Sequence, residues 1–258
     1  MENAIRPAVY PSLEDRVVMV TGGATGIGEA TVEAFAMQKA QVIFLDIQDD
    51  AGDRLIRRLE SAGLKTPVYR HCDLTDIDAL QKTVGDLLVA FPRIDVLVNN
   101  ASDDTRHSME EVNSAYWDQS IAVNLKHYFF MMQAVVPAMR SAGRGSIINM
   151  GSVSWIISTA NLPVYVTAKA AIVGMSRTFA RQLGSDNIRV NCVMPGAVLT
   201  ERQRQLWYTD AYRARILANQ SLKRMILPDE VARLVLFLAS DDSSAITNQS
   251  YVIDGGWI

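Results

Sequence analysis

The sequence predicts an α/β fold in which one parallel sheet of seven strands is flanked by helices on both faces. Seven short runs rich in Val and Ile alternate with helical patterns from Arg16 onward. Most of these runs are continuously apolar, as parallel strands covered on both faces are. No repeat or linker marks a second domain, so we expect residues 1–258 to form a single doubly wound domain of the Rossmann type.

The expected strands are Arg16–Thr21, Ala40–Asp46, Pro67–His71, Ile94–Asn100, Gly145–Met150, Ile188–Val193 and Ser250–Gly256. Helical patterns such as "AGDRLIRRLESAG" and "DALQKTVGDLLVAF" lie between them. The helix expected over Ser114–Met139 is apolar on nearly every side. Such a helix must be covered all round, either within a thick core alone or by its sheet and a second subunit, and we favour the second interpretation.

Composition and charge limit the class of protein. The formal net charge of −3 gives no reason to expect a nucleic-acid partner, which would need a basic face. The N-terminal segment "MENAIRPAVYPSLEDR" lacks the apolar core of a signal peptide, and no apolar run reaches the ~18–20 residues of a membrane span. Cys72 and Cys192 make no metal-binding pattern and are expected to be reduced thiols. We therefore expect a cytoplasmic protein without a membrane, nucleic-acid or metal partner.

A glycine-rich segment, "TGGATGIG", follows the first strand and opens a helix. Gly22, Gly26 and Gly28 are spaced G-x-x-x-G-x-G rather than G-x-G-x-x-G. The physical requirement is the same: a tight turn, close approach of the backbone to a pyrophosphate, and a helix N-terminus that faces anionic oxygen. Glycines alone are also common in simple turns, so the neighbouring strand ends decide between the two interpretations.

The end of the second strand favours NAD over NADP. Asp46 follows Gly28 by eighteen residues, where a carboxylate accepts hydrogen bonds from the ribose diol of adenosine. The same carboxylate repels a 2′-phosphate, and neither Thr25 nor Ile47 supplies a cation to bind one. Asp73 and Leu74 end the third strand, beside the expected adenine. Polar groups at successive strand ends predict a binding crevice.

Tyr165 and Lys169 place a phenol and an ammonium in the otherwise small and apolar segment "VYVTAKAA". Residues four apart share one face of a helix, about 6 Å apart along its axis. At that distance and an effective dielectric constant of ~20, a lysine charge favours the phenolate by about 2.8 kcal/mol, or about two pKa units. We therefore expect the pKa of Tyr165 to be lowered, which makes it a general base. The alternative is a snorkelling Lys beside an interfacial Tyr.

Further polar residues lie near this pair. Ser152, at the end of the fifth strand, is placed to hold a substrate oxygen beside the phenol, although a lone serine there is more often a cap. Asn124 stands in an apolar helix, where it either bonds to the backbone or marks a kink that holds a water. "MPGAVLT" ends the sixth strand; Pro195 and Gly196 suit a turn against the nicotinamide.

Taken together, these motifs resemble the short-chain dehydrogenase/reductase superfamily, from "TGGATGIG" through "NNAS", "GSVSW", "YVTAK" and "MPGAVLT" to "IDGGW". The resemblance implies hydride transfer at nicotinamide C4, usually in a homotetramer. It implies that Tyr165 is the acid/base, that Ser152 orients the reacting oxygen, that Lys169 binds the nicotinamide ribose, and that Asn124 anchors a proton-relay water. Ser102 stands where the family commonly has glycine; we expect the serine to be tolerated, with backbone strain as the alternative.

The residues expected to bind NAD are Gly22, Thr25, Gly26, Ile27, Gly28, Asp46, Ile47, Asp73, Leu74, Asn100, Ala101, Tyr165, Lys169, Pro195, Gly196, Val198 and Thr200.

The segments "DDTRHSMEEVNSAYWDQSIAVNLKH", "GSVSW", "RQRQLWYTD" and "YVIDGGW" carry a narrower resemblance. They resemble the bacterial aldose 1-dehydrogenases, which act on D-xylose, L-arabinose or L-fucose and form a sugar lactone. It implies a substrate lid at about residues 197–222. The side chains suited to a sugar are Ser152 and Tyr165 at the reacting hydroxyl, Arg106, His107 and Arg202 for ring hydroxyls, and Trp155, Trp207 and Tyr208 for C–H-rich ring faces. The stretch Ile156–Pro163 departs from the xylose enzymes, which leaves the sugar open.

Two other functions are compatible with the sequence. One is oxidation or reduction of another alcohol, steroid or ketone, including acyl-carrier substrates; Asp46 argues against the NADPH that acyl-carrier reductases commonly use. The other is a dinucleotide sensor without catalysis, which would have no need of the complete set of Asn124, Ser152, Tyr165 and Lys169.

Overall fold

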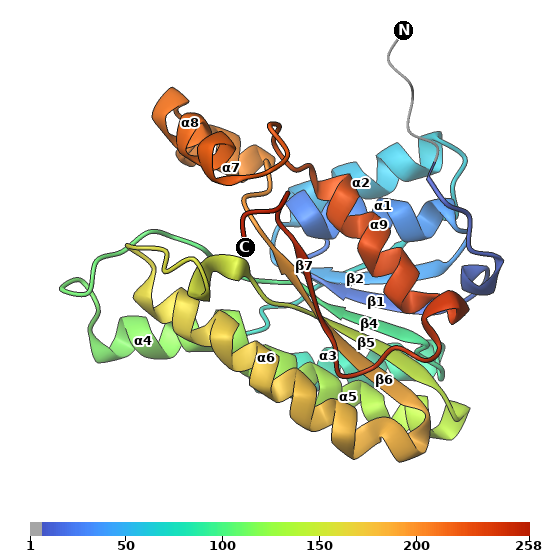
Figure 1. Ribbon diagram of the computed structural model, residues 1–258. Coiled ribbons are helices and arrows are strands. Elements are labelled where there is room, and N and C mark those ends of the chain that lie inside the picture. Colours follow the sequence, from blue (N-terminus) through green and yellow to red (C-terminus); the bar gives the residue numbers. More distant parts are fainter. Residues whose placement is uncertain (1–6) are drawn as a thin grey trace, which may run out of the picture.

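The computed structural model describes residues 7–258; residues 1–6, where the segment without a signal-peptide pattern begins, lie outside the described part. A single sheet of seven parallel strands forms the centre of the molecule, with helices on both faces (Figure 1). The strands are β1 (Val17–Thr21), β2 (Gln41–Asp46), β3 (Val68–His71), β4 (Val96–Asn99), β5 (Gly145–Met150), β6 (Ile188–Pro195) and β7 (Ser250–Ile253).

The order of the strands across the sheet is β3-β2-β1-β4-β5-β6-β7. The order reverses between β1 and β4, and a crevice at the carboxyl ends of the strands is expected at such a point. The predicted fold class is confirmed, and all seven predicted strands are present. β6 continues through Pro195, which we expected in a turn, and β4 is shorter than predicted.

The helices are α1 (Gly26–Met37), α2 (Asp49–Ser61), α3 (Ile77–Ala90), α4 (Ser114–Ile121), α5 (His127–Ala142), α6 (Pro163–Leu183), α7 (Glu201–Leu206), α8 (Asp210–Asn219) and α9 (Pro228–Ala239). Shorter helical turns are η1 (Pro11–Leu13), the π-helical η2 (Ala122–Lys126), η3 (Val153–Trp155), η4 (Gly184–Asp186) and η5 (Asp241–Ser243). Within residues 7–258, no helix is both long and apolar enough to cross a membrane.

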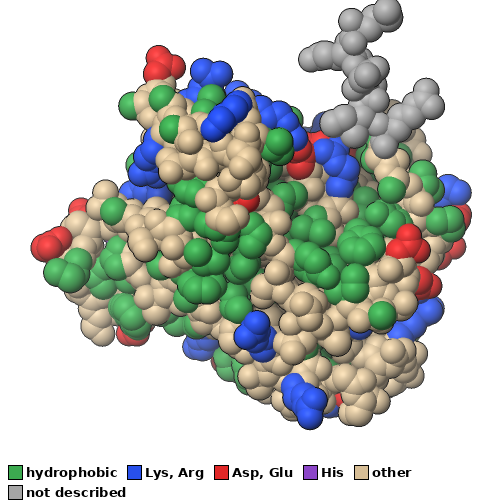
Figure 2. Space-filling view, in the orientation of Figure 1, with side chains coloured by type: hydrophobic (Ala, Val, Ile, Leu, Met, Phe, Trp, Pro, Cys, Tyr) green, Lys and Arg blue, Asp and Glu red, His purple; other side chains and the backbone are tan. Residues whose placement is uncertain are grey.

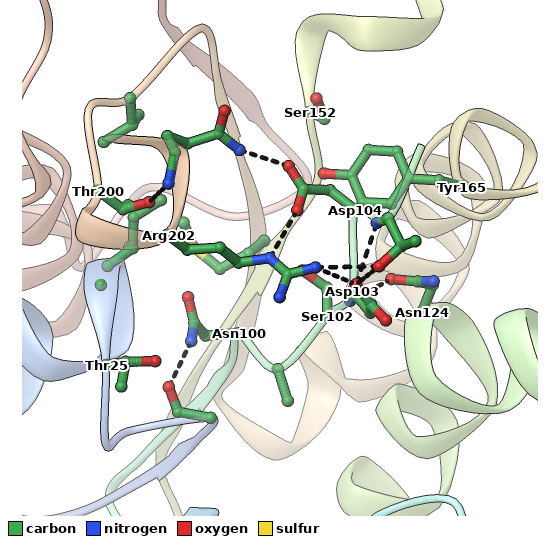
Figure 3. A pocket seen from close by; sticks show the side chains of 18 of the residues that line it. Thr25, Asn100, Ser102, Asp103, Asp104, Asn124, Ser152, Tyr165, Thr200 and Arg202 are labelled. Carbon is green, nitrogen blue, oxygen red and sulfur yellow. Dashed lines mark hydrogen bonds and ion pairs between the residues drawn. The ribbon is translucent and has the colours of Figure 1, made fainter. Parts of the chain in front are cut away.

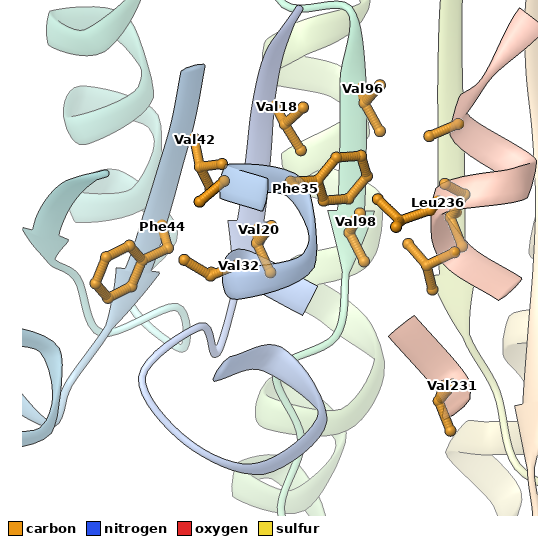
Figure 4. Close-up of a cluster of buried hydrophobic side chains, with 14 of the residues drawn as sticks. Val18, Val20, Val32, Phe35, Val42, Phe44, Val96, Val98, Val231 and Leu236 are labelled. Atoms are coloured by element: carbon orange, nitrogen blue, oxygen red, sulfur yellow. The ribbon is translucent and has the colours of Figure 1, made fainter. Parts of the chain in front are cut away.

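Two apolar layers hold the helices on the sheet. On one face, Val18 and Val20 of β1 and their neighbours pack against Val32 and Phe35 of α1 and Leu236 of α9 (Figure 4). On the other face, alternate strand residues pack against α3, α5 and α6. Because successive residues of each strand point to opposite faces and both faces are covered, the strands need continuous apolar runs. This packing fixes the strand ends that carry the polar residues of the site.

The predicted helix Ser114–Met139 is divided into three parts. Its first part is α4 and its last part is α5, and the π-helical turn η2 lies between them. In η2 the His127 N–H bonds to the Ala122 carbonyl, five residues back instead of four. π-helical turns of this kind are frequent at functional sites. The kink expected at Asn124 therefore takes the form of a π-helical turn.

Candidate active site

A cleft of about 1370 Å³ lies at the carboxyl ends of the strands. It runs from Asp46 and Arg54, beside α2, to Tyr165 and Arg202, where α6 approaches α7. Its floor contains the point between β1 and β4 at which the strand order reverses. This is the place where open parallel sheets bind their ligands.

The glycine-rich turn at one end of the cleft is built by close contacts. Gly22 has φ +63°, and a Cβ there would lie 2.7 Å from the Ala101 Cα. The Asn100 side-chain amide donates to the Gly22 carbonyl at 3.0 Å, which fixes the turn. A Cβ at Gly28 would lie only 1.8 Å from the Gly22 carbonyl oxygen. Gly28 therefore allows α1 to pack against the turn.

The N-terminus of α1 opens into the cleft. Thr25 is its N-cap, and its side chain makes no capping hydrogen bond to the described part of the chain. The first N–H groups of a helix have no intrahelical partner and favour anionic oxygen. Asp46, at the end of β2, holds the same region: its carboxylate accepts from the N–H groups of Ala24 at 2.9 Å and Ile47 at 2.8 Å. This arrangement fits a dinucleotide, with the pyrophosphate at the α1 N-terminus and the adenosine toward Asp46.

The structure brings together all of the residues predicted to bind the cofactor except Gly28, which does not line the cleft formed by residues 7–258. Those that line it are Gly22, Thr25, Gly26, Ile27, Asp46, Ile47, Asp73, Leu74, Asn100, Ala101, Tyr165, Lys169, Pro195, Gly196, Val198 and Thr200.

Tyr165 and Lys169 lie on one face of α6 at the opposite end of the cleft. The Lys169 Nζ is 5.5 Å from the centre of the Tyr165 ring, and the lysine side chain is buried. Its ammonium donates to the Met150 carbonyl at 2.9 Å and to the Tyr128 hydroxyl at 3.1 Å. Tyr128 in turn donates to the same carbonyl at 3.1 Å. The lysine is thus held under Tyr165 by β5 and α5, and Tyr128 is a partner that the sequence did not reveal.

The prediction that Tyr165 has a lowered pKa is wrong when only the protein's own groups act on the phenol. Burial raises the pKa of Tyr165 above 10, and the charge of Asp104 raises it further, whereas a hydrogen bond from Ser152 and the charge of Arg106 act in the opposite direction. Burial also lowers the pKa of Lys169 to about 7. The spacing gave the right distance, but it carried no information on burial, which disfavours both charged forms.

Ser152 and Asn124 complete the chemical end of the cleft. The Ser152 hydroxyl accepts from the Ser154 N–H at 3.1 Å, so this serine caps η3, and its side chain lowers the pKa of the neighbouring Tyr165. Asn124 is buried in η2, and its side-chain oxygen accepts from the Asp103 N–H at 2.9 Å. Its side-chain nitrogen donates to the Ser120 hydroxyl at 3.3 Å, so Asn124 connects the end of α4 to a neighbouring loop. All four residues predicted to be catalytic line the cleft.

The wall above Tyr165 is formed by α7 and by the loop between β4 and α4 (Figure 3). Arg202 of α7 pairs with Asp103 at 2.8 Å and with Asp104 at 3.2 Å. Arg106 and Arg202 both line the cleft, as predicted for sugar-binding residues. The helices α7 and α8 (Figure 1) occupy most of the predicted lid region, residues 197–222, and contribute Arg202 and Tyr212 to the lining of the cleft.

Comparison with known proteins identifies the family. The family model described as enoyl-(acyl carrier protein) reductase matches residues 22–258. D-xylose 1-dehydrogenase of Caulobacter vibrioides is 48% identical over 250 residues, which are 97% of this chain and 98% of that protein. The probable galactose dehydrogenase of Rhizobium meliloti is 44% identical over 247 residues, or 96% of each protein.

A solved structure, that of 3-oxoacyl-[acyl-carrier protein] reductase from Brucella melitensis, matches with a TM-score of 0.91 at 30% identity, over 100% of this chain and 98% of that one. The chain belongs to the short-chain dehydrogenase/reductase family. This short-chain dehydrogenase/reductase is thus an oxidoreductase, and members of the family use nicotinamide cofactors.

Four residues predicted to contact the substrate of this short-chain dehydrogenase do not line the cleft formed by residues 7–258: Trp155, His107, Trp207 and Tyr208. One face of Trp207 is covered by the Arg106 guanidinium, 5.3 Å from the ring centre. Trp155 is exposed on η3 outside the cleft. Aromatic rings often stack on sugar rings, but the sequence does not show which way a given ring faces. Here contacts with distant residues determine the orientation.

His107 has a structural role that the sequence did not show. Its Nε2 accepts from the Val164 N–H at 3.3 Å, in the first turn of α6, and its Nδ1 lies 2.9 Å from the Thr105 carbonyl. The nitrogen that accepts from Val164 must be unprotonated, so the proton is on Nδ1. His107 thus connects the β4–α4 loop to the helix that carries Tyr165.

Several cleft residues were missed, among them Asp103, Asp104, Gln203 and Tyr212. Two consecutive carboxylates directly after "NNAS" were a signal, because polar residues that follow a strand of a parallel sheet lie at the crevice. Ser102 is tolerated, as expected: within residues 7–258, it is not among the non-glycine residues with positive φ.

Proposed function

We propose that this enzyme oxidises the anomeric C1 hydroxyl of an aldose, a pentose or 6-deoxyhexose, with NAD, and that the product is a sugar lactone. The observation that carries the proposal is the meeting of Ser152, Tyr165 and Lys169 below a wall of hydrogen-bonding side chains. The relatives named for D-xylose and galactose, at 48% and 44% identity over nearly the full chain, support a sugar as the substrate.

The chain supplies the proton chemistry. The Ser152 hydroxyl is placed to bind the oxygen that reacts, and Tyr165 is placed to take its proton as a phenolate. An ammonium has three donors, and within residues 7–258 the Lys169 ammonium bonds to Met150 and Tyr128. Because Lys169 lines the cleft, its third donor is suited to a ribose hydroxyl. When bound, the oxidised nicotinamide supplies the hydride acceptor and a positive charge.

NAD is the proposed cofactor because the carboxylate of Asp46 lies at the adenosine end of the cleft. Arg54 also lines this end and carries the cation that a 2′-phosphate would require. The two residues therefore act in opposite directions on the choice of cofactor. A comparison of kcat/KM for NAD and NADP tests which one dominates; a higher value for NADP would overturn this part of the proposal.

The test of the reaction is NADH formation across a panel of pentoses, 6-deoxyhexoses and hexoses. Tyr165→Phe should lower kcat by about 10²- to 10⁴-fold, the usual contribution of a general base, while NADH binding stays close to that of the wild type. Tyr251→Phe, the same change in β7 away from the cleft, is the matched control and should keep the wild-type rate. Wild-type turnover in Tyr165→Phe would refute the role of the phenol.

The second candidate is oxidation of another secondary alcohol or reduction of a ketone, including acyl-carrier substrates. The structural similarity to a 3-oxoacyl-[acyl-carrier protein] reductase favours it. Turnover of a secondary alcohol or a 3-oxoacyl thioester, without turnover of any aldose, would decide for this candidate. Binding of NADH without turnover of any of these compounds would indicate a sensor.

We also propose a homotetramer. Apolar side chains gather on the face that carries α9 and β7 (Figure 2), where Val252 is 41% exposed. On α5, Phe129 is exposed to the same extent, and this exposed ring supports the proposal of a subunit contact on that helix. Light scattering of the purified protein at micromolar concentration tests this proposal, and a monomeric mass would overturn it.

A further inference from the structure

The carboxylate of Asp104 stands in the wall of the cleft, in the loop between β4 and α4. One oxygen accepts from the Arg202 Nε at 3.2 Å, and the other accepts from the side-chain amide of Gln203. The side chain is 23% exposed and lines the cleft. Asp104 is thus held in a fixed position from the side of α7, with its other side toward the open space.

That open side is the side of the reacting centre. In Figure 3 the Asp104 carboxylate and the Tyr165 hydroxyl lie next to one another, with Ser152 nearby. The two groups are close enough that the charge of Asp104 raises the pKa of Tyr165. The other charged group that acts on the phenol is Arg106, from the same loop, and it acts in the opposite direction.

A carboxylate at this place has a cost for catalysis, because it opposes ionisation of the base. Holding α7 does not require it, since Asp103 already pairs with Arg202 at 2.8 Å. Its two oxygens offer about four acceptor positions, and Arg202 and Gln203 occupy one on each oxygen. About two acceptor positions therefore remain on this cleft-lining side chain. An apolar or ester substrate leaves them unpaired, whereas a neighbouring hydroxyl group pairs with them.

We propose that Asp104 accepts a hydrogen bond from the hydroxyl on the carbon next to the one that is oxidised, and that it thereby selects substrates with two adjacent hydroxyl groups. This inference rests on the proposed function, in which the reacting hydroxyl is at C1 of an aldose and its neighbour is the hydroxyl at C2. A site built to bond a substrate hydroxyl discriminates against analogues that lack it, because its own polar group is then left unpaired.

The experiment combines a change in the enzyme with a change in the substrate. The substrates are the aldose turned over best in the panel and its 2-deoxy analogue; the variants are Asp104→Asn and Asp103→Asn. The wild type should prefer the parent sugar by about tenfold to a hundredfold in kcat/KM, the usual effect of one hydrogen bond to a charged group. In Asp104→Asn this preference should fall to within a few-fold.

Asp103→Asn is the matched control. The Asp103 side chain pairs with the same arginine and otherwise bonds to Thr105, in its own turn. Its replacement removes one charge and one contact to α7, so it should change kcat/KM for both sugars by the same factor and keep the preference. Equal loss of the preference in both variants would show that the effect comes through α7, and it would overturn the proposal.

The dependence of activity on pH is a second measurement, and weaker packing alone would not change it. Removal of the Asp104 charge lowers the pKa of Tyr165, so the rise of activity with pH should shift to lower pH in Asp104→Asn and stay in place in Asp103→Asn. A wild-type enzyme that oxidises aldoses and their 2-deoxy analogues equally well would refute the role of Asp104 while the proposed function stands. If no aldose is oxidised at all, the proposed function itself fails.

Discussion

Replacement of Gly28 by Ala tests how the dinucleotide end of the cleft is built. The added Cβ would lie 1.8 Å from the Gly22 carbonyl oxygen and 2.7 Å from the Asn100 side-chain nitrogen, far inside the ~3.5–4.0 Å at which non-bonded atoms normally meet. The first contact is with backbone, which cannot rotate away. The glycine-rich turn or the start of α1 must therefore move, at a cost of about 1–3 kcal/mol for overpacking.

Binding of NADH then requires the turn to regain its original conformation against this free energy, so the Kd for NADH should rise by about 5- to 150-fold. The measurement is a fluorescence titration with NADH, together with the free energy of unfolding in denaturant. Gly85→Ala in α3 is the control, because a Cβ there meets no described atom within 4 Å. It should leave the Kd unchanged and stabilise the helix by about 0.5–1 kcal/mol. Wild-type affinity and stability in Gly28→Ala would refute this account of the turn.

Two further predictions concern α6. His107→Ala leaves the buried Val164 N–H without its acceptor and should lower the free energy of unfolding, measured in denaturant, by about 1–3 kcal/mol. In His107→Gln part of this loss should be recovered. Equal stability of the two variants would contradict the role given to the imidazole. Lys169→Met tests burial of the ammonium, whose pKa is lowered to about 7. Between about pH 7 and pH 10.5 the unfolded chain binds one proton more than the folded chain, so the free energy of unfolding of the wild type relative to the variant should rise with pH, by at most ~1.4 kcal/mol per pH unit. A difference between the two proteins that stays constant with pH in denaturant titrations would exclude this.

The sequence predicted the strands, the crevice at their ends and the shared face of Tyr165 and Lys169 well, because the sequence patterns for these features are local. Continuous apolar runs marked the strands, and polar residues directly after them, such as Asp46 and Asn100, marked the crevice. The spacing of Tyr165 and Lys169 placed both side chains on one face of α6. These inferences depend only on the periods of strands and helices and on the rule that parallel strands end at the same edge.

The inferences that failed depend on contacts between distant segments. Arg106 covers a face of Trp207, and His107 bonds to the first turn of α6, so neither aromatic character nor charge showed where these residues face. The pKa of Tyr165 depends on how much protein surrounds the pair, and spacing along a helix carries no measure of burial. Asp104 was missed because its significance lies in its position opposite Tyr165, far along the chain.

The π-helical turn η2 contains one residue more than a turn of a regular α-helix would. Because an α-helix turns by about 100° per residue, one additional residue changes the face that α5 presents relative to α4. Thus α4 turns Tyr116 and Ser120 toward the cleft while α5 keeps Met131 and Val135 in the core. Deletion of a single residue here would restore a regular helix and rotate one half against the other, so that either the cleft wall or the core would receive the wrong side chains. Substitutions within the turn keep this rotation, whereas a one-residue deletion removes it.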